Sequence, residues 1–192
     1  IVSVEVTNDA TDVMFKINLT GDIVATDWGK YMVGIDVDGQ FGFTGDPLGN
    51  GWNRPIGMSY GMDKWIGGWV DGGGGRQIWD YDDSLTSWNQ LNQTGVSINT
   101  TSVTYTVSIA DLGLNFGDSF DFDVYSSGGG GGDGAIDSLA NPNQTVSGWG
   151  DYYDSSTNAV YTYTLVRPPD PTNKVTFIVS VEGAARDGDF VP

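Results

Sequence analysis

The sequence predicts an all-β fold, a two-sheet antiparallel β-sandwich of jelly-roll type with long glycine-rich loops. Several short segments alternate apolar and polar residues with a period of two, as half-buried strands do. Clusters of Gly, Asn and Asp separate these segments and supply the residue types that turns require. No segment keeps a helical period over three turns, so we expect many short strands packed in two layers.

The expected strands follow one another along the chain at 2–6, 13–19, 31–37, 103–109, 120–125, 160–165 and 175–181. Their β-branched and aromatic residues suit a pleated surface that is buried on one side. One helical turn is expected at 110–113, a segment too short for a longer helix. Two glycine runs, 72–75 and 128–132, lie between these segments and predict long loops.

The composition excludes several classes of function. The chain has 8 basic and 25 acidic residues and a formal net charge of −17, which disfavours binding to nucleic acid or anionic lipid. It has neither Cys nor His, so disulfides, thiolate metal sites, Ser-His-Asp triads and His-ligated zinc are all excluded. With 23 Asp, a pair of carboxylates at a catalytic spacing would arise by chance and carries no information. We therefore expect a protein that is not an enzyme and has no nucleic-acid partner.

No apolar run approaches the roughly 18–20 residues that a membrane-spanning helix needs. The chain begins at Ile1 rather than at Met, as a processed secreted chain would. We therefore expect no membrane span and an extracellular or cell-surface location.

The length of 192 residues suits one domain with a short appendage. We expect a β-sandwich domain at 1–166, a Pro-rich linker at 167–173 and a tail with one extra strand at 174–192. Residues 178–182 repeat residues 1–5 letter for letter. A match of five strand-like residues can arise by chance. Its place after the Pro-rich linker favours two other interpretations of the tail, the first strand of a following domain or a strand donated to a neighbouring copy of the protein. Its expected assembly positions are Val175, Phe177, Val179 and Val181.

Five of the seven tryptophans fall within residues 50–88. Sugars present flat apolar C–H faces and hydroxyl groups, so a sugar site combines a flat aromatic ring with polar side chains. The alternative is that these rings fill the core between two sheets. The expected ligand-binding residues are Trp65, Trp69, Trp79, Tyr81 and Trp88, with Arg54 and Arg76 as polar partners.

Aspartates in turns predict a Ca²⁺ site, because Ca²⁺ prefers oxygen ligands from short loops. Asp36 and Asp38 are two residues apart and lie on one face of a strand that ends in a turn. Asp133 and Asp137 could add ligands from the loop after the second glycine run. The alternative is that these aspartates cap turns and bind no metal.

Four segments carry a resemblance to a known family: 7–15, 31–38, 107–113 and 120–125. Together they resemble the opening, a central strand, a one-turn helix and a late core strand of DOMON-like domains, which include the family 9 carbohydrate-binding modules. The resemblance implies an extracellular β-sandwich with a binding or adhesive role and no catalysis. The segment 175–179 resembles the first strand of the small starch-binding-like domains.

Two hypotheses of function follow. The first is a carbohydrate-binding module that holds a polysaccharide or glycan on its aromatic residues and that binds Ca²⁺. The alternative is a structural subunit of an extracellular filament or surface layer. In that case the C-terminal strand of each copy would complete a sheet of the next, head to tail.

Overall fold

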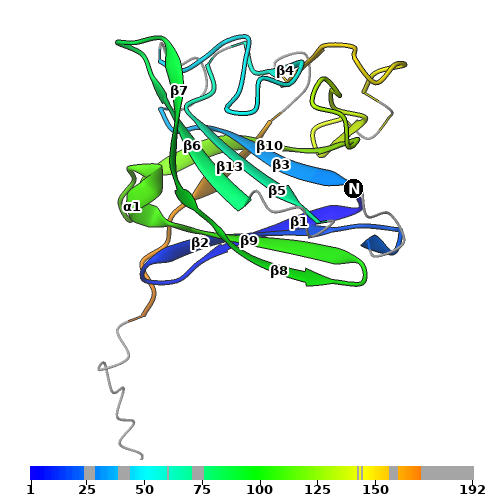
Figure 1. Ribbon diagram of the computed structural model, residues 1–192. Helices are drawn as coiled ribbons and strands as arrows, with labels where there is room; N and C mark the ends of the chain where they lie inside the picture. Colours follow the sequence, from blue (N-terminus) through cyan, green and yellow to red (C-terminus); the bar gives the residue numbers. More distant parts are fainter. Residues whose placement is uncertain are drawn as a thin grey trace, which may run out of the picture.

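A computed structural model describes residues 1–23, 29–38, 44–59, 61–70, 76–141, 143, 145–155 and 160–169, and within them the chain forms two antiparallel sheets packed face to face (Figure 1). The predicted all-β class and the two-sheet antiparallel architecture are confirmed. In the described part of the chain, no helix has the length and apolarity to cross a bilayer.

The small sheet has four strands in the order β1–β2–β9–β8. Polar and apolar residues alternate in β2 and β9, and the apolar ones point at the large sheet. The β1–β2 turn is held by Asp9, whose Oδ1 accepts hydrogen bonds from the backbone N–H groups of Thr11 and Asp12, both at 2.8 Å. The bounds are β1 Ser3–Asn8, β2 Asp12–Asn18, β8 Gly95–Asn99 and β9 Ser102–Ser108.

The large sheet has seven strands in the order β11–β10–β3–β5–β6–β7, with β13 also paired to β10. Its central strands β3, β5 and β10 are buried on both faces over most of their length, which means that both faces of this sheet are covered. The bounds are β3 Lys30–Asp36, β5 Lys64–Trp69, β6 Arg76–Asp82, β7 Ser87–Gln93, β10 Ser119–Ser127, β11 Asp137–Ser138 and β13 Tyr161–Thr164.

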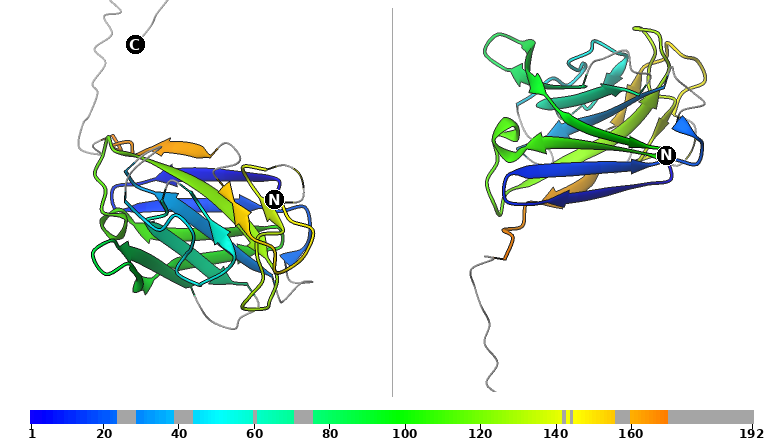
Figure 2. Two further views of the ribbon diagram at one scale, coloured as in Figure 1. Left: turned by 90° about the horizontal axis from the view of Figure 1, so that it is seen from above. Right: turned by 60° about the horizontal axis from the view of Figure 1, so that its bottom comes forward.

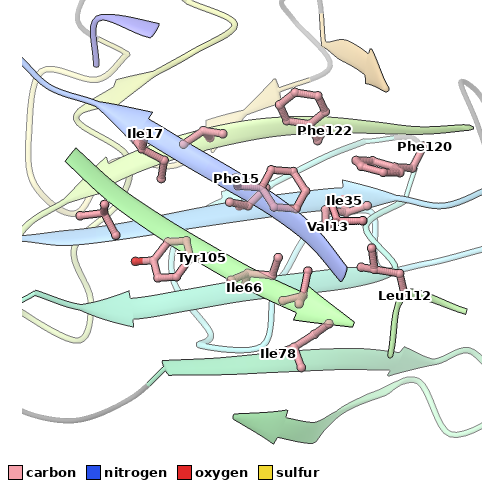
Figure 3. Close-up of a cluster of buried hydrophobic side chains, with 14 of the residues drawn as sticks. Val13, Phe15, Ile17, Ile35, Ile66, Ile78, Tyr105, Leu112, Phe120 and Phe122 are labelled. Carbon is pink, nitrogen blue, oxygen red and sulfur yellow. The ribbon is translucent and has the colours of Figure 1, made fainter. Parts of the chain in front are cut away.

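The first core fills the space between the two sheets (Figure 3). Phe15 of the small sheet packs against Phe120 and Phe122 of the large sheet, with ring centroids 5.9 and 5.7 Å apart. Tyr105 is fully buried there, and its hydroxyl donates to the backbone oxygen of Tyr31 at 2.9 Å. Apolar burial across this seam joins the two layers of the sandwich.

The second core lies on the other face of the large sheet, which we call the outer face. Segments 44–59, 128–136 and 145–155 cross this face, mostly as loops (Figures 1 and 2). Trp65 and Tyr125 project from the sheet into the loops and stack with centroids 5.9 Å apart. Within the loops, two short strands pair in parallel, β4 Ile56–Gly57 and β12 Tyr153–Asp154.

The predicted single helical turn is α1, Ile109–Leu112, between β9 and β10. Ser108 caps its first turn by accepting the N–H of Asp111 at 2.9 Å. Gly113 ends it with a φ of 74°, a left-handed conformation that glycine adopts at little cost.

Near its described end, Leu165 is buried and donates its N–H to the backbone oxygen of Asp118 at 2.9 Å. Contacts with the sandwich continue to Arg167, whose guanidinium lies over the Phe116 ring, 4.9 Å from its centroid. The predicted assembly strand, with Val175, Phe177, Val179 and Val181, lies outside the described residues. The glycine run at 72–75 also lies outside them. The predicted domain boundaries therefore stay predictions.

Candidate functional site

The outer face carries the polar and aromatic groups that could bind a ligand. Successive residues of β5 point to opposite faces, so Ile66 enters the first core while Trp65 enters the second. Trp69 is on the same face as Trp65 and is 38% exposed. The Lys30 ammonium lies over the Trp69 ring, 5.0 Å from its centroid.

Trp52 comes from the loop before β4 and lies over this face of β5. Its ring meets Trp65 and Trp69 edge to face, at centroid distances of 6.4 and 6.2 Å. Gly67 leaves the room for it, because a Cβ built on Gly67 would approach the Trp52 Cζ2 to 2.5 Å. A loop tryptophan is thereby seated on the sheet itself.

Gln77 fixes the orientation of two indole rings. Its Oε1 accepts hydrogen bonds from the indole N–H of Trp52 at 2.8 Å and of Trp79 at 3.1 Å. Both partners donate, so the oxygen of the Gln77 amide must face them. Its NH₂ group makes no hydrogen bond with any described residue and can donate to a ligand.

A second aromatic pair lies further along β6 and β7. Tyr81 and Trp88 are directly opposite in the register, and their ring centroids are 5.4 Å apart. The indole N–H of Trp88 donates to Asp46 at 2.8 Å. Burial, with Asp46 and Asp83 adding to it, raises the pKa of the Tyr81 hydroxyl. We refer to the half-buried or exposed rings of this region as the aromatic face: Trp52, Trp69, Trp79, Tyr81 and Trp88.

The structure places three of the predicted ligand contacts away from this surface. Trp65 is fully buried in the second core. Arg54 is buried as well, and its guanidinium donates to Ser127 and to the backbone oxygen of Asp133, both at 2.8 Å. Arg76 is exposed but pairs with Gly68. Because Gly68 faces Tyr105 of the first core, Arg76 belongs to the opposite face of the sheet.

A carboxylate cluster lies at the end of the outer face, beside the Tyr81–Trp88 pair. It consists of Asp36, Asp38 and Asp63, each with an oxygen within 4.8 Å of the others. Asp36 ends β3, and Asp63 comes directly before β5. These two strands are paired as far as Ile35 and Lys64, so extending the register brings Asp36 opposite Asp63.

Two carboxyl groups of the cluster have raised pKa values. Burial raises the pKa of Asp36 to about 8, and the neighbouring carboxyl of Asp38 and the charge of Asp63 add to the shift. Burial is also the largest cause that raises the pKa of Asp63. Both shifts mean that the negative charge of these groups is poorly compensated by the surrounding protein.

The other two aspartates of the predicted Ca²⁺ site lie elsewhere. Asp133 accepts a hydrogen bond from the N–H of Gly130 at 2.9 Å and closes a tight turn in the loop 128–134. Asp137 on β11 forms an ion pair with the amino group of Ile1. In the described part of the chain, the structure therefore brings together Asp36 and Asp38 but joins them to Asp63 instead.

Sequence reasoning missed three contributors to these sites: Asp63, Trp52 and Asp46. Asp63 is far from Asp38 in the chain, and only the register of β3 and β5 reveals their proximity. Two glycines could have indicated the position of Trp52: its neighbour Gly51 and Gly67 of β5. A glycine within a strand often marks a place where a large side chain packs against the backbone.

We compared the chain with protein-family models, curated proteins and solved structures, and none of them matches it. The resemblance to DOMON-like domains therefore stays a prediction from the sequence, and the site is interpreted from its own chemistry.

Proposed function

We propose that this protein is a non-catalytic extracellular module that binds a carbohydrate on its aromatic face. The observation that carries the proposal is the way in which the rings are held. Gln77 and Asp46 already accept the indole N–H groups of Trp52, Trp79 and Trp88. These rings therefore have fixed orientations, and their remaining exposed surface is apolar, which suits the C–H face of a sugar.

The polar groups beside the rings suit hydroxyl groups. Gln90 is opposite Trp79, and Gln93 is opposite Gln77, so these amides belong to the same face of β6 and β7. Both are exposed. An amide donates and accepts hydrogen bonds, as a sugar hydroxyl does, so the two can pair reciprocally.

The negative net charge of the chain favours a neutral sugar over an acidic one. A formal net charge of −17 repels sulfated and uronic-acid polymers. We therefore propose a neutral polysaccharide, bound along the direction in which the rings follow one another from Trp69 on β5 to Trp88 on β7.

The proposal is tested by measuring the affinity of the chain for neutral glucans, xylans and mannans, by affinity electrophoresis or calorimetry. Trp69→Ala removes the most exposed ring of the aromatic face. We expect the variant to lose about 10-fold or more in affinity, since that factor corresponds to about 1.4 kcal/mol of lost contact.

Tyr161→Ala is the matched control, because Tyr161 is 48% exposed but lies on β13, at the opposite edge of the large sheet. This variant should bind as the wild type does. Absence of binding to every polysaccharide, or an equal loss in both variants, would contradict the proposal.

A further inference from the structure

The carboxylate cluster, Asp36, Asp38 and Asp63, holds a group that the protein leaves unsatisfied. Asp36 is 0% exposed, and its Oδ2 has no hydrogen-bond partner. Its Oδ1 accepts one weak bond, from the N–H of Asp38 at 3.1 Å. A buried carboxylate oxygen without a partner costs free energy, so a native protein keeps one only where another group satisfies it.

The donors offered to the cluster are too few for its charge. Asp63 accepts the N–H of Val37 at 2.8 Å, and the hydroxyl of Thr44 is shared between Asp38 at 2.8 Å and Asp63 at 3.1 Å. With the Asp38 N–H, three donors from the described part of the chain serve three carboxyl groups. Among the described residues, no Lys or Arg pairs with any of them.

A fourth carboxyl adds to the negative potential. Asp121 of β10 is directly opposite Asp36 of β3 in the register, so both side chains point to the outer face. Asp121 is 2% exposed and accepts a hydrogen bond from the hydroxyl of Thr162. Like charges opposite one another destabilise a sheet, which a bound cation would reverse.

We infer that Asp36, Asp38 and Asp63 bind a Ca²⁺ ion. Ca²⁺ lies about 2.3–2.6 Å from its oxygen ligands, so two oxygens on one ion are at most about 5 Å apart. The oxygens of the three aspartates meet this limit, since all lie within 4.8 Å of one another. The donor set contains only hard oxygens, which Ca²⁺ prefers and which soft transition metals do not.

The ion would also connect the segment before β5 to the aromatic face. Asp63 is next to Met62, which exchanges backbone hydrogen bonds with Asp46 at 2.9 and 3.0 Å. Asp46 in turn accepts the indole N–H of Trp88. The cation site is thus connected to one end of the aromatic face through a short chain of hydrogen bonds. The inference does not rest on sugar binding, because it stands on the carboxylates alone.

The test is calorimetric titration of the chelator-treated protein with CaCl₂ up to about 1 mM, the upper range for extracellular Ca²⁺ modules. Thermal unfolding is followed in Ca²⁺, in Mg²⁺ and in chelator. We expect one Ca²⁺ per chain and an unfolding midpoint that rises by several degrees in Ca²⁺ and by less in Mg²⁺.

Asp36→Asn and Asp63→Asn should each lower the Ca²⁺ affinity at least about 10-fold. Asp111→Asn, on the helical turn, removes the same charge at a residue outside the cluster and should bind as the wild type does. In chelator, Asp36→Asn should unfold at a temperature at least as high as that of the wild type, because its NH₂ group replaces an oxygen that has no hydrogen-bond partner in the protein. This last readout shows that the variant is folded.

Three results would overturn the inference: no Ca²⁺ binding at about 1 mM, an Asp36→Asn affinity equal to that of the wild type, or a larger stabilisation by Mg²⁺ than by Ca²⁺. A protein that binds Ca²⁺ but no polysaccharide would leave the cation site standing and overturn the proposed function, and the reverse result would do the opposite.

Discussion

The two faces of the large sheet differ in what they bury. The inner face meets the small sheet through Phe, Ile, Val and Leu side chains, and the first core is almost entirely apolar. The outer face meets loops through Trp, Tyr and Met, and it also buries Asp36, Asp63, Asp123 and Arg54. Buried charges cost stability unless they are well paired. The comparison indicates that the inner face stabilises the fold by apolar burial, whereas the outer face also buries charged groups. Two of these, Asp36 and Asp63, belong to the proposed Ca²⁺ site.

The largest expected effect is on the inner face. Phe15 is fully buried between the sheets, so Phe15→Ala should lower the free energy of unfolding by about 3–5 kcal/mol, measured by urea denaturation. Phe15→Leu keeps most of the volume and should lose less. A loss of less than about 1 kcal/mol for Phe15→Ala would mean that the first core does not hold the layers together.

Substitutions at two adjacent glycines of β5 distinguish the two faces of the large sheet, and their expected effect on stability is smaller. A Cβ on Gly67 would strike the Trp52 ring, and a Cβ on Gly68 would strike the Tyr105 hydroxyl group on the other face. Gly67→Ala and Gly68→Ala should therefore each cost about 1–3 kcal/mol of stability, through overpacking.

Only Gly67→Ala should change sugar affinity and the fluorescence of the aromatic face, because only Trp52 belongs to it. Calorimetry and tryptophan emission spectra of the two folded variants provide the measurement. If Gly68→Ala alters the emission and the affinity as much as Gly67→Ala does, the two faces are not independent.

The smallest expected effect is a change in the pH dependence of stability. Asp123 is fully buried and accepts hydrogen bonds from two serine hydroxyls and two backbone N–H groups. Burial nevertheless raises its pKa above the ordinary value near 3.8, despite these bonds. The folded state therefore holds the proton more tightly than the unfolded state, and this carboxyl contributes a loss of stability as the pH rises through that range.

Asp123→Asn removes this contribution. Its amide oxygen can keep the N–H groups of Val124 and Ala140, while its NH₂ group faces the hydroxyls of Ser138 and Ser155. The stability of the variant relative to the wild type should thus increase as the pH rises from about 4. Urea denaturation at several pH values measures it, and a difference that stays constant with pH would contradict the account.

The sequence predicted three of the four strands of the small sheet, β1, β2 and β9, because their alternation is local and visible in the sequence. None of the strands expected from period-two alternation lies between 37 and 103, where the structure has β4, β5, β6, β7 and β8. Strand β5 is buried on both faces and contains Trp and Gly, so it does not alternate. Strand β7 is a polar edge strand and has no apolar pattern to detect.

The candidate site residues also show that only local patterns could be predicted from the sequence. Asp36 and Asp38 were found because strand geometry places neighbours two apart on one face. Asp63 was missed because its proximity depends on a pairing that closes over a long loop. Asp133 and Asp137 were grouped with them by composition, and the fold separates them. The local period of two predicts which residues share one face of a strand, but it does not predict which strands pair and bring distant residues together.

The most direct test of the central claim, that the aromatic face binds a neutral carbohydrate, is a nitrogen–proton NMR titration with soluble neutral oligosaccharides of glucose, xylose and mannose. The seven indole N–H signals are assigned by Trp→Phe variants. The account predicts that one of these sugars shifts the signals of Trp69 and Trp79 and leaves that of Trp149, an exposed ring outside the aromatic face, unchanged. Shifts confined to Trp149, or no shift with any of the sugars, would contradict it.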